Sequence, residues 1–144
     1  MPECYRHYLP SAKRILIVDD SPTIRRMVRA SVTHTGADAF SEAGSGLEAI
    51  EQLMLDTTAL MILDLNMPDM HGLEVLKFVR QHATFRTLPV IVLTTRGDES
   101  SREAAMTAGA SAYMTKPFAP QVLAEHVRQL LGASASEEGH RARS

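Results

Sequence analysis

The sequence has little of what marks secreted, membrane-spanning and nucleic-acid-binding proteins. Its single cysteine, Cys4, cannot form a disulfide within the chain and fits a reducing compartment. The formal net charge of −2 gives no overall positive field that could hold nucleic acid. No run approaches the about 20 apolar residues of a membrane span, and the opening segment MPECYRHYLPSAKR lacks the apolar part of a secretory signal. We therefore expect a cytoplasmic protein with no membrane insertion and no nucleic-acid partner.

The composition of the 144 residues, 44% hydrophobic and 22% charged, is that of one globular domain. A chain of this length can bury a core without disulfides or structural metals. We predict a flexible N-terminal arm at residues 1–13, which carry two prolines and no periodic pattern, and one domain at residues 14–132. The last segment, ASASEEGHRARS, is small, polar and charged, so residues 133–144 are predicted to be a disordered tail. We expect a monomer.

Short apolar runs alternate with helical patterns along this domain. The runs predict buried parallel strands at residues 14–19, 37–42, 59–64, 89–94 (or 95) and 111–115. Ser21 and Asp98 are placed to cap helices, Pro22 suits a first helical position, and Gly132 is expected to end the last helix. The apolar faces predicted for the helices include Met27, Leu47, Ile50, Leu53, Met54 and Val122.

Five repeats of strand and helix predict an α/β fold, a doubly wound three-layer sandwich with a parallel sheet between two layers of helices. In such a sheet, ligands bind outside the carboxyl ends of the strands. The residues at those ends are Asp19, Asp20, Asp64, Thr94 and Lys116. We therefore expect three carboxylates, a hydroxyl and an ammonium group to meet in one crevice.

These residue types suit phosphoryl chemistry assisted by a metal ion. Three carboxylates favour Mg²⁺ over Zn²⁺, because Mg²⁺ takes oxygen ligands and keeps water and phosphate oxygens in its coordination shell. A carboxylate such as Asp64 can attack phosphorus and form an aspartyl phosphate, and Lys116 can hold a phosphate oxygen. Each residue also has a simpler interpretation: a solvated turn for Asp19 and Asp20, and an exposed surface residue for Lys116. We favour the joint site because all of these residues lie at strand ends.

The residues alone do not decide the roles of two further positions. Thr94 has a hydroxyl that could donate to a phosphate oxygen, but Thr95 is a rival, and a β-branched residue is also at home in a strand. Tyr113 lies on the strand that leads to Lys116 and, taken alone, is interpreted as a half-buried aromatic that fills space.

Four motifs in order, VDDSPTIRRMV, LDLNMPDMHG, VLTT and AGASAYMTKPF, resemble the receiver domain of bacterial two-component response regulators. The resemblance covers residues 14–132 and is strongest to the stand-alone chemotaxis (CheY-like) type. It implies a flavodoxin-like sheet of five parallel strands in the order 2-1-3-4-5.

The resemblance also implies a role for each site residue. Asp64 would be the phosphoacceptor, and Mg²⁺ would be held by Asp20 and Asp64 directly, by Asp19 mostly through water, and by the backbone carbonyl of Asn66. Lys116 would pair with the phosphate.

Other roles implied by the resemblance concern signalling. Thr94, rather than Thr95, would be the switch hydroxyl, and Tyr113 the switch aromatic. The Lys116–Pro117 bond would be cis, and the last two helices with the strand between them would form the output surface. Arg96 and Asn66 would flank the path of the hydrolytic water and influence the lifetime of the phosphate. His71 stands where many relatives have Asp, with little expected effect.

On this hypothesis a histidine kinase or a phosphotransfer protein would supply the phosphoryl group, and a protein such as a flagellar motor switch would be the target. The protein would not be an enzyme in the usual sense, because it would catalyse only its own phosphorylation and slow dephosphorylation. One alternative is a phosphorelay intermediate, adaptor or phosphate sink outside chemotaxis. Another is a phosphohydrolase, which is disfavoured because Asn66 stands where a general acid would be expected and no cap domain is recognised.

Overall fold

The structure, a computed structural model, describes residues 13–95 and 97–143. Arg96 and nearly all of the predicted N-terminal arm therefore lie outside the described residues. The strands are β1 (Arg14–Val18), β2 (Ala39–Ala43), β3 (Leu60–Leu63), β4 (Val90–Thr94) and β5 (Ala112–Thr115). They pair in parallel in the order β2-β1-β3-β4-β5, which confirms the predicted sheet.

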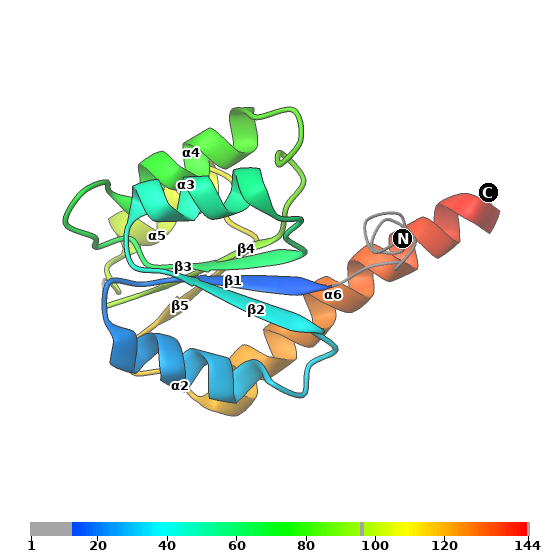
Figure 1. The fold of residues 1–144 in the computed structure, drawn as a ribbon, viewed down its shortest axis with the longest axis horizontal. Helices are drawn as coiled ribbons and strands as arrows, with labels where there is room; N and C mark the ends of the chain where they lie inside the picture. The colour runs from blue at the N-terminus through cyan, green and yellow to red at the C-terminus, as the bar shows by residue number, and fades with distance from the viewer. Residues whose placement is uncertain (1–12, 96, 144) are drawn as a thin grey trace.

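The helices form two layers on opposite sides of this sheet (Figure 1). One layer contains α3 (Gly46–Leu55), α4 (Gly72–Gln81) and α5 (Glu99–Thr107), and the other contains α2 (Pro22–Val32) and α6 (Pro120–Arg143). The predicted doubly wound three-layer sandwich is thus confirmed. Among the described residues, none of the helices combines the length and apolar character that crossing a bilayer requires.

The sheet is buried on both faces, so it separates two apolar core clusters. Along β1, Ile15 and Ile17 pack with α2 and α6, whereas Leu16 and Val18 pack with the helices of the other layer. This alternation follows from the opposite directions of successive side chains on a strand. Three of the four strands that lead to the polar residues, β1, β3 and β4, are inner strands and are paired on both sides, whereas β5 is an edge strand.

The predicted helix caps are confirmed in the structure. The hydroxyl of Ser21 accepts a hydrogen bond from the backbone N–H of Ile24, with Pro22 in the first turn. Asp98 caps α5, and hydrogen bonds from the Ser100 hydroxyl and from the backbone N–H and hydroxyl of Ser101 hold its pKa down to about 2.

The predicted core face of α3 is correct at Leu53, which is buried, but it is rotated by about one residue at the other positions. Leu47 and Met54, which the sequence assigns to the buried stripe, are 57% and 59% exposed, and Gly46 and Ala49 face the core in their place. The small residues are buried because α3 lies close to the loop before α4: a Cβ on Gly46 would lie 2.7 Å from the Cβ of Met70. Met27 on α2 and Val122 on α6 are likewise about half exposed, at 51% and 49%.

The predicted end of the last helix is also wrong, because α6 continues through Gly132 to Arg143. Residues 133–143, which the sequence assigns to a disordered tail, are helical. A glycine inside a helix costs only about 1 kcal/mol relative to alanine, and the residues that follow include the good helix formers Ala, Glu and Arg. The domain boundaries at residues 14 and 132 stay a prediction.

Candidate functional site

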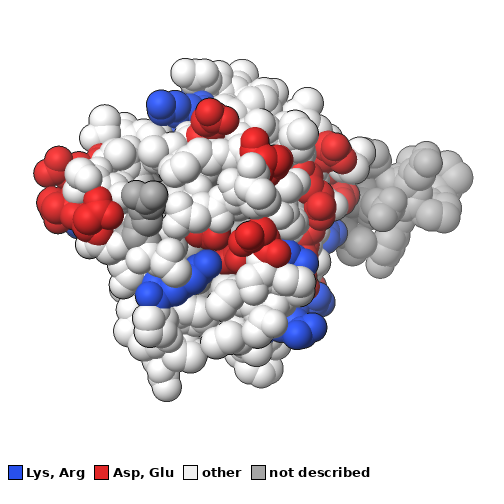
Figure 2. Space-filling view, turned by 90° about the vertical axis from the view of Figure 1, so that its left-hand side faces the viewer, with Lys and Arg blue, Asp and Glu red and all other residues white. Residues whose placement is uncertain are grey.

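The site lies at the carboxyl edge of the sheet, where four strand ends bring distant residues together. Asp19 follows β1, Asp64 follows β3, Thr94 ends β4 and Lys116 follows β5. Figure 2 shows this edge of the molecule, with acidic side chains near the centre of the face and basic side chains mainly below them. The predicted convergence is present.

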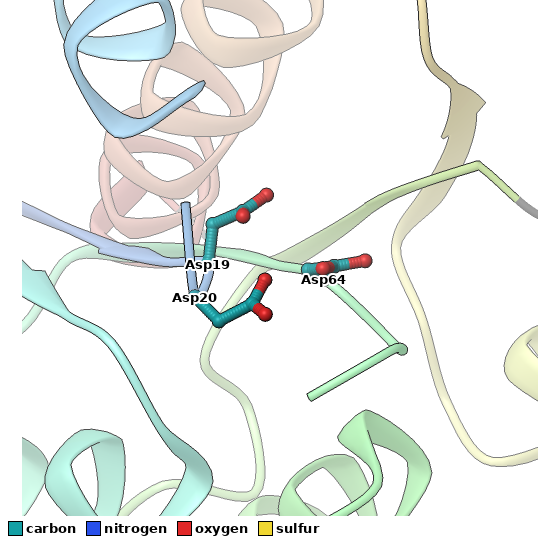
Figure 3. Close-up of side chains that lie close together, drawn as sticks. All are labelled: Asp19, Asp20 and Asp64. Carbon is teal, nitrogen blue, oxygen red and sulfur yellow. The ribbon is translucent and has the colours of Figure 1, made fainter. Parts of the chain in front are cut away.

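Asp19, Asp20 and Asp64 form a compact cluster of carboxylates. One oxygen from each lies within 4.8 Å of the others, and Figure 3 shows the three side chains projecting to the same side beyond the ends of β1 and β3. Asp19 and Asp64 are only 3% and 5% exposed, whereas Asp20 lies on the open side of the cluster. The pocket therefore has a buried floor and one accessible carboxylate.

Lys116 supplies a positive charge to the buried floor of this pocket. Its Nζ lies 2.5 Å from an oxygen of Asp19 and 3.5 Å from an oxygen of Asp64. Burial raises the pKa of Asp64, and the neighbouring charge of Asp19 raises it further, while Lys116 lowers it; the net shift is upward. An ionised Asp64 is thus held at a cost in free energy that a further cation would reduce.

The donor atoms of this cluster fit Mg²⁺. All three side chains offer carboxylate oxygens, the ligands that Mg²⁺ prefers, and the exposed side leaves room for water or phosphate oxygens. Backbone N–H groups orient the buried carboxylates: that of Ser21 donates to Asp19 at 2.9 Å and that of Asn66 donates to Asp64 at 3.3 Å. Such outer contacts fix ligand direction in metal sites.

The two threonines at the end of β4 have different environments. Thr94 is fully buried and its side chain hydrogen-bonds with Asp64, whereas Thr95 is exposed. The Asn66 side-chain amide donates to the hydroxyl oxygens of both, at 3.4 Å to Thr94 and 3.3 Å to Thr95. Tyr113 lies half-buried on β5 and packs against the core cluster on the side of α3, α4 and α5. The Lys116–Pro117 bond is cis.

Three residues hold the loops of the site in ways that the sequence did not predict. Asp69 accepts hydrogen bonds from the backbone N–H groups of Gly46 and Leu47, both at 3.1 Å, and so ties the loop after Asp64 to the start of α3. His71 caps α4 by accepting from the N–H of Leu73 at 3.1 Å. No local pattern marks either role, because Asp69 acts across more than twenty residues and His is an uncommon cap.

Arg25 is the third of these residues, and it holds the loop that carries the acidic pair. Its guanidinium donates to the backbone carbonyl of Asp19 and, at 2.8 Å, to Glu42 of β2. The side chain is only 17% exposed. Arg25 therefore links α2, β2 and the turn after β1.

Comparison with known proteins identifies the family. The family model described as "Response regulator receiver domain" matches residues 15–128. The chemotaxis protein CheY1 of Helicobacter pylori is 39% identical over 122 residues, which are 84% of this chain and 98% of that protein. The CheY-like receiver domain structure from Methanospirillum hungatei JF-1 has a TM-score of 0.80 at 28% identity and covers 88% of this chain and 99% of that chain.

A third similar protein comes from a different signalling context. The receiver domain of a signal transduction histidine kinase from Syntrophus aciditrophicus has a TM-score of 0.77 at 35% identity, covering 85% of this chain and 92% of that chain. The fold, the acidic pocket and the comparisons all indicate the same family. The chain belongs to the family of response regulator receiver domains, of the CheY-like type.

Replacing Arg25 should loosen the acidic pocket. We expect Arg25→Met to weaken Mg²⁺ binding a few-fold and to lower the free energy of unfolding by about 1 kcal/mol, because the carbonyl of Asp19 and the Glu42 carboxylate lose a charged donor. The matched control is Arg26→Met, since Arg26 is the exposed neighbour on the same helix. Calorimetric Mg²⁺ titration and urea unfolding measure the two effects, and equal results for both variants would contradict this role of Arg25.

Proposed function

We propose that the protein is a single-domain response regulator that accepts a phosphoryl group on Asp64 with the help of Mg²⁺. The observation that carries the proposal is the position of Asp64, a buried carboxylate that adjoins two more carboxylates on one side and Lys116 on the other. A structural salt bridge would need one carboxylate, not three. The arrangement instead suits a nucleophile that must meet a dianionic group beside a divalent cation.

The proposed reaction is an in-line transfer to oxygen. An oxygen of Asp64 attacks the phosphorus atom of a phosphohistidine; the new P–O bond forms as the P–N bond breaks, and the leaving imidazole takes up a proton. Asp19, Asp20, Asp64 and the backbone carbonyl of Asn66 would hold the metal ion, which when bound neutralises charge on the transferring group. Lys116, already at the pocket floor, would pair with a phosphate oxygen.

The phosphate would then bias an equilibrium between two conformations of the domain. The Thr94 hydroxyl, now near Asp64 and Asn66, would donate to a phosphate oxygen. Tyr113 would repack as Thr94 moves, since it lies on the neighbouring strand opposite Val92. The proposed output surface is the α5–β5–α6 face, where Met106 and Val122 are exposed.

Chemotaxis is the proposed setting, because a relative that is matched over 98% of its own length is a chemotaxis protein. The proposed partners are a histidine kinase or phosphotransfer protein as donor and a protein such as a flagellar motor switch as target.

A role as phosphorelay intermediate, adaptor or phosphate sink is the second candidate, favoured by the similarity to a receiver domain of a histidine kinase. Pull-downs with and without beryllofluoride distinguish the two: recovery of motor components supports chemotaxis, and recovery of phosphotransfer proteins alone supports a relay.

Incubation with acetyl phosphate tests the proposed chemistry. With Mg²⁺ present we expect the intact mass to rise by one phosphoryl group, and with EDTA we expect little or no rise, because the carboxylate cluster then lacks a cation for the incoming charge. Asp64→Asn is the control that locates the group. A Mg²⁺-independent adduct, or one that survives this substitution, would reject the proposal.

A further inference from the structure

Charge is unevenly distributed along the chain, and α3 lies in the acidic part. Between Arg29 and Lys77 the sequence contains no Lys or Arg. The same stretch contains these acidic residues: Asp38, Glu42, Glu48, Glu51, Asp56, Asp64, Asp69 and Glu74. Figure 2 shows acidic side chains along the upper right of the face, in a part where basic ones are scarce. Glu42 is paired with Arg25 and Arg29, and Asp64 is buried beside Lys116. The excess negative charge around α3 therefore comes from exposed residues such as Glu48, Glu51 and Asp56, although the net charge of the chain is only −2.

The outer face of α3 is also apolar. Leu47, Met54 and Leu55 are 57%, 59% and 76% exposed, so this ten-residue helix carries half of the large apolar side chains that are exposed among the described residues. Glu48 and Glu51 lie on the same exposed part of the helix and form no ion pair within the described part of the chain. Grouped apolar side chains beside unpaired charges are typical of an interaction surface.

A cavity continues this face beyond the end of α3. It has a volume of about 380 Å³ and is lined by Met54, Leu55 and Asp56 from the end of α3 and by His82 and Phe85 from the loop after α4. The rings of His82 and Phe85, stacked with 4.5 Å between their centroids, form the aromatic part of a lining that also includes Thr57, Thr58 and Thr84. An apolar side chain could be inserted there, next to the carboxylate of Asp56.

We propose that this α3 surface (Leu47, Glu48, Glu51, Met54, Leu55 and the adjoining cavity) docks an amphipathic basic helix of a partner protein. The partner helix would place apolar residues at i, i+3 or i+4 and i+7 on the Leu47–Met54 stripe and Lys or Arg beside Glu48 and Glu51. A second copy of the chain is a weaker fit. A symmetric contact between two copies would place the acidic side chains Glu48 and Glu51 of one α3 against those of the other, and like charges that face each other are unfavourable.

The surface is separate from the α5–β5–α6 face, and the inference does not rest on phosphorylation of Asp64. It is nevertheless joined to the acidic pocket, because Asp69 ties the start of α3 to the loop after Asp64. A partner bound on α3 would thus contact the same helix to which Asp69 ties the loop after Asp64.

A model peptide tests the α3 surface directly. The probe is a fluorescein-labelled amphipathic helix of Leu and Lys, about 18 residues long so that it can be helical alone, and binding to the full chain is followed by anisotropy. We expect Glu48→Lys with Glu51→Lys to weaken binding about tenfold or more, and Met54→Ser with Leu55→Ser to weaken it about fivefold. Amide shifts on binding should concentrate in residues 46–56 and 82–85.

Matched variants outside α3 serve as controls. Glu99→Lys with Glu103→Lys makes the same change in net charge on another exposed helix, and Met27→Ser removes an exposed methionine of α2. We expect at most a twofold effect from either. Three results would each overturn the proposal. The first is equal weakening of binding by the α3 variants and the control variants, and the second is amide shifts centred on the acidic pocket or on α5–β5–α6. The third is concentration-dependent self-association of the protein that Glu48→Lys abolishes.

Discussion

Asp64→Asn should abolish phosphoryl uptake and leave the protein at least as stable as the wild type when no divalent cation is present. The loss of uptake follows from chemistry, because the amide of Asn is not a nucleophile toward phosphorus under these conditions. The effect on phosphorylation is therefore complete rather than partial. It should hold for acetyl phosphate and for a phosphohistidine donor alike.

The retained stability follows from the electrostatics of the pocket. Burial raises the pKa of Asp64, and Lys116 offsets only part of this. When the pKa of a carboxyl group is higher in the folded than in the unfolded protein, the free energy of unfolding of the protein falls as pH rises through the interval between the two pKa values. At neutral pH the ionised Asp64 is thus unfavourable to folding, and a neutral amide of the same size removes that cost.

Two measurements check this prediction. Intact mass after treatment with acetyl phosphate and Mg²⁺ reports uptake, and thermal unfolding in EDTA reports stability. Adding Mg²⁺ should then raise the Tm of the wild type more than that of the variant, because the variant has one carboxylate fewer in the cluster. Asp56→Asn, at an exposed aspartate, should retain uptake and change the stability by less than about 0.5 kcal/mol. Marked destabilisation of Asp64→Asn in EDTA would contradict the electrostatic account.

Gly72→Ala should lower both stability and phosphorylation, although alanine is the better helix former. A Cβ at position 72 would lie 2.4 Å from the backbone oxygen of Asp64 and 2.7 Å from the Cα of Leu65. Both contacts are with backbone, so the start of α4 or the loop after β3 must move. We expect a loss near the upper end of the about 1–3 kcal/mol typical of overpacking, together with slower phosphorylation as Asp64 is displaced.

Gly132→Ala is the matched control for this substitution. A Cβ at Gly132 meets nothing within 4 Å, and the residue lies inside α6. The same chemical change should therefore stabilise the protein, by up to about 1 kcal/mol. Urea unfolding and the rate of phosphorylation by acetyl phosphate measure both variants. The interpretation fails if Gly72→Ala is as stable and as rapidly phosphorylated as the wild type.

The strand ends were predictable from sequence because two local signals agree there. Apolar runs mark the strands, and Asp19, Asp64 and Lys116 each follow directly after such a run. Parallel topology then brings these ends to one edge without any knowledge of side-chain contacts. The caps Ser21 and Asp98 were likewise predictable, since a cap bonds to an N–H only a few residues further on.

The buried side of α3 could not be found in this way. Leu53 was predicted correctly, but both Leu47 with Met54 and Gly46 with Ala49 have helical spacing, and hydrophobicity favours the pair that is exposed. Close approach of α3 to the loop at Met70 selects the small residues. That selection depends on the distance between two elements, which no local pattern contains.

The sequence alone determined the order of elements, a parallel sheet and the set of polar residues at its carboxyl edge, because each of these follows from periodicity and from the rules of parallel topology. The strand order 2-1-3-4-5 was implied by the resemblance to receiver domains. The tertiary structure decided how those residues are held. Arg25 and Asp69 act through contacts between segments 17 to 23 residues apart, and Lys116 reaches Asp19 from 97 residues away. Contacts of that kind exist only when the chain has folded, and so do the exposed face of α3 and the surface it offers.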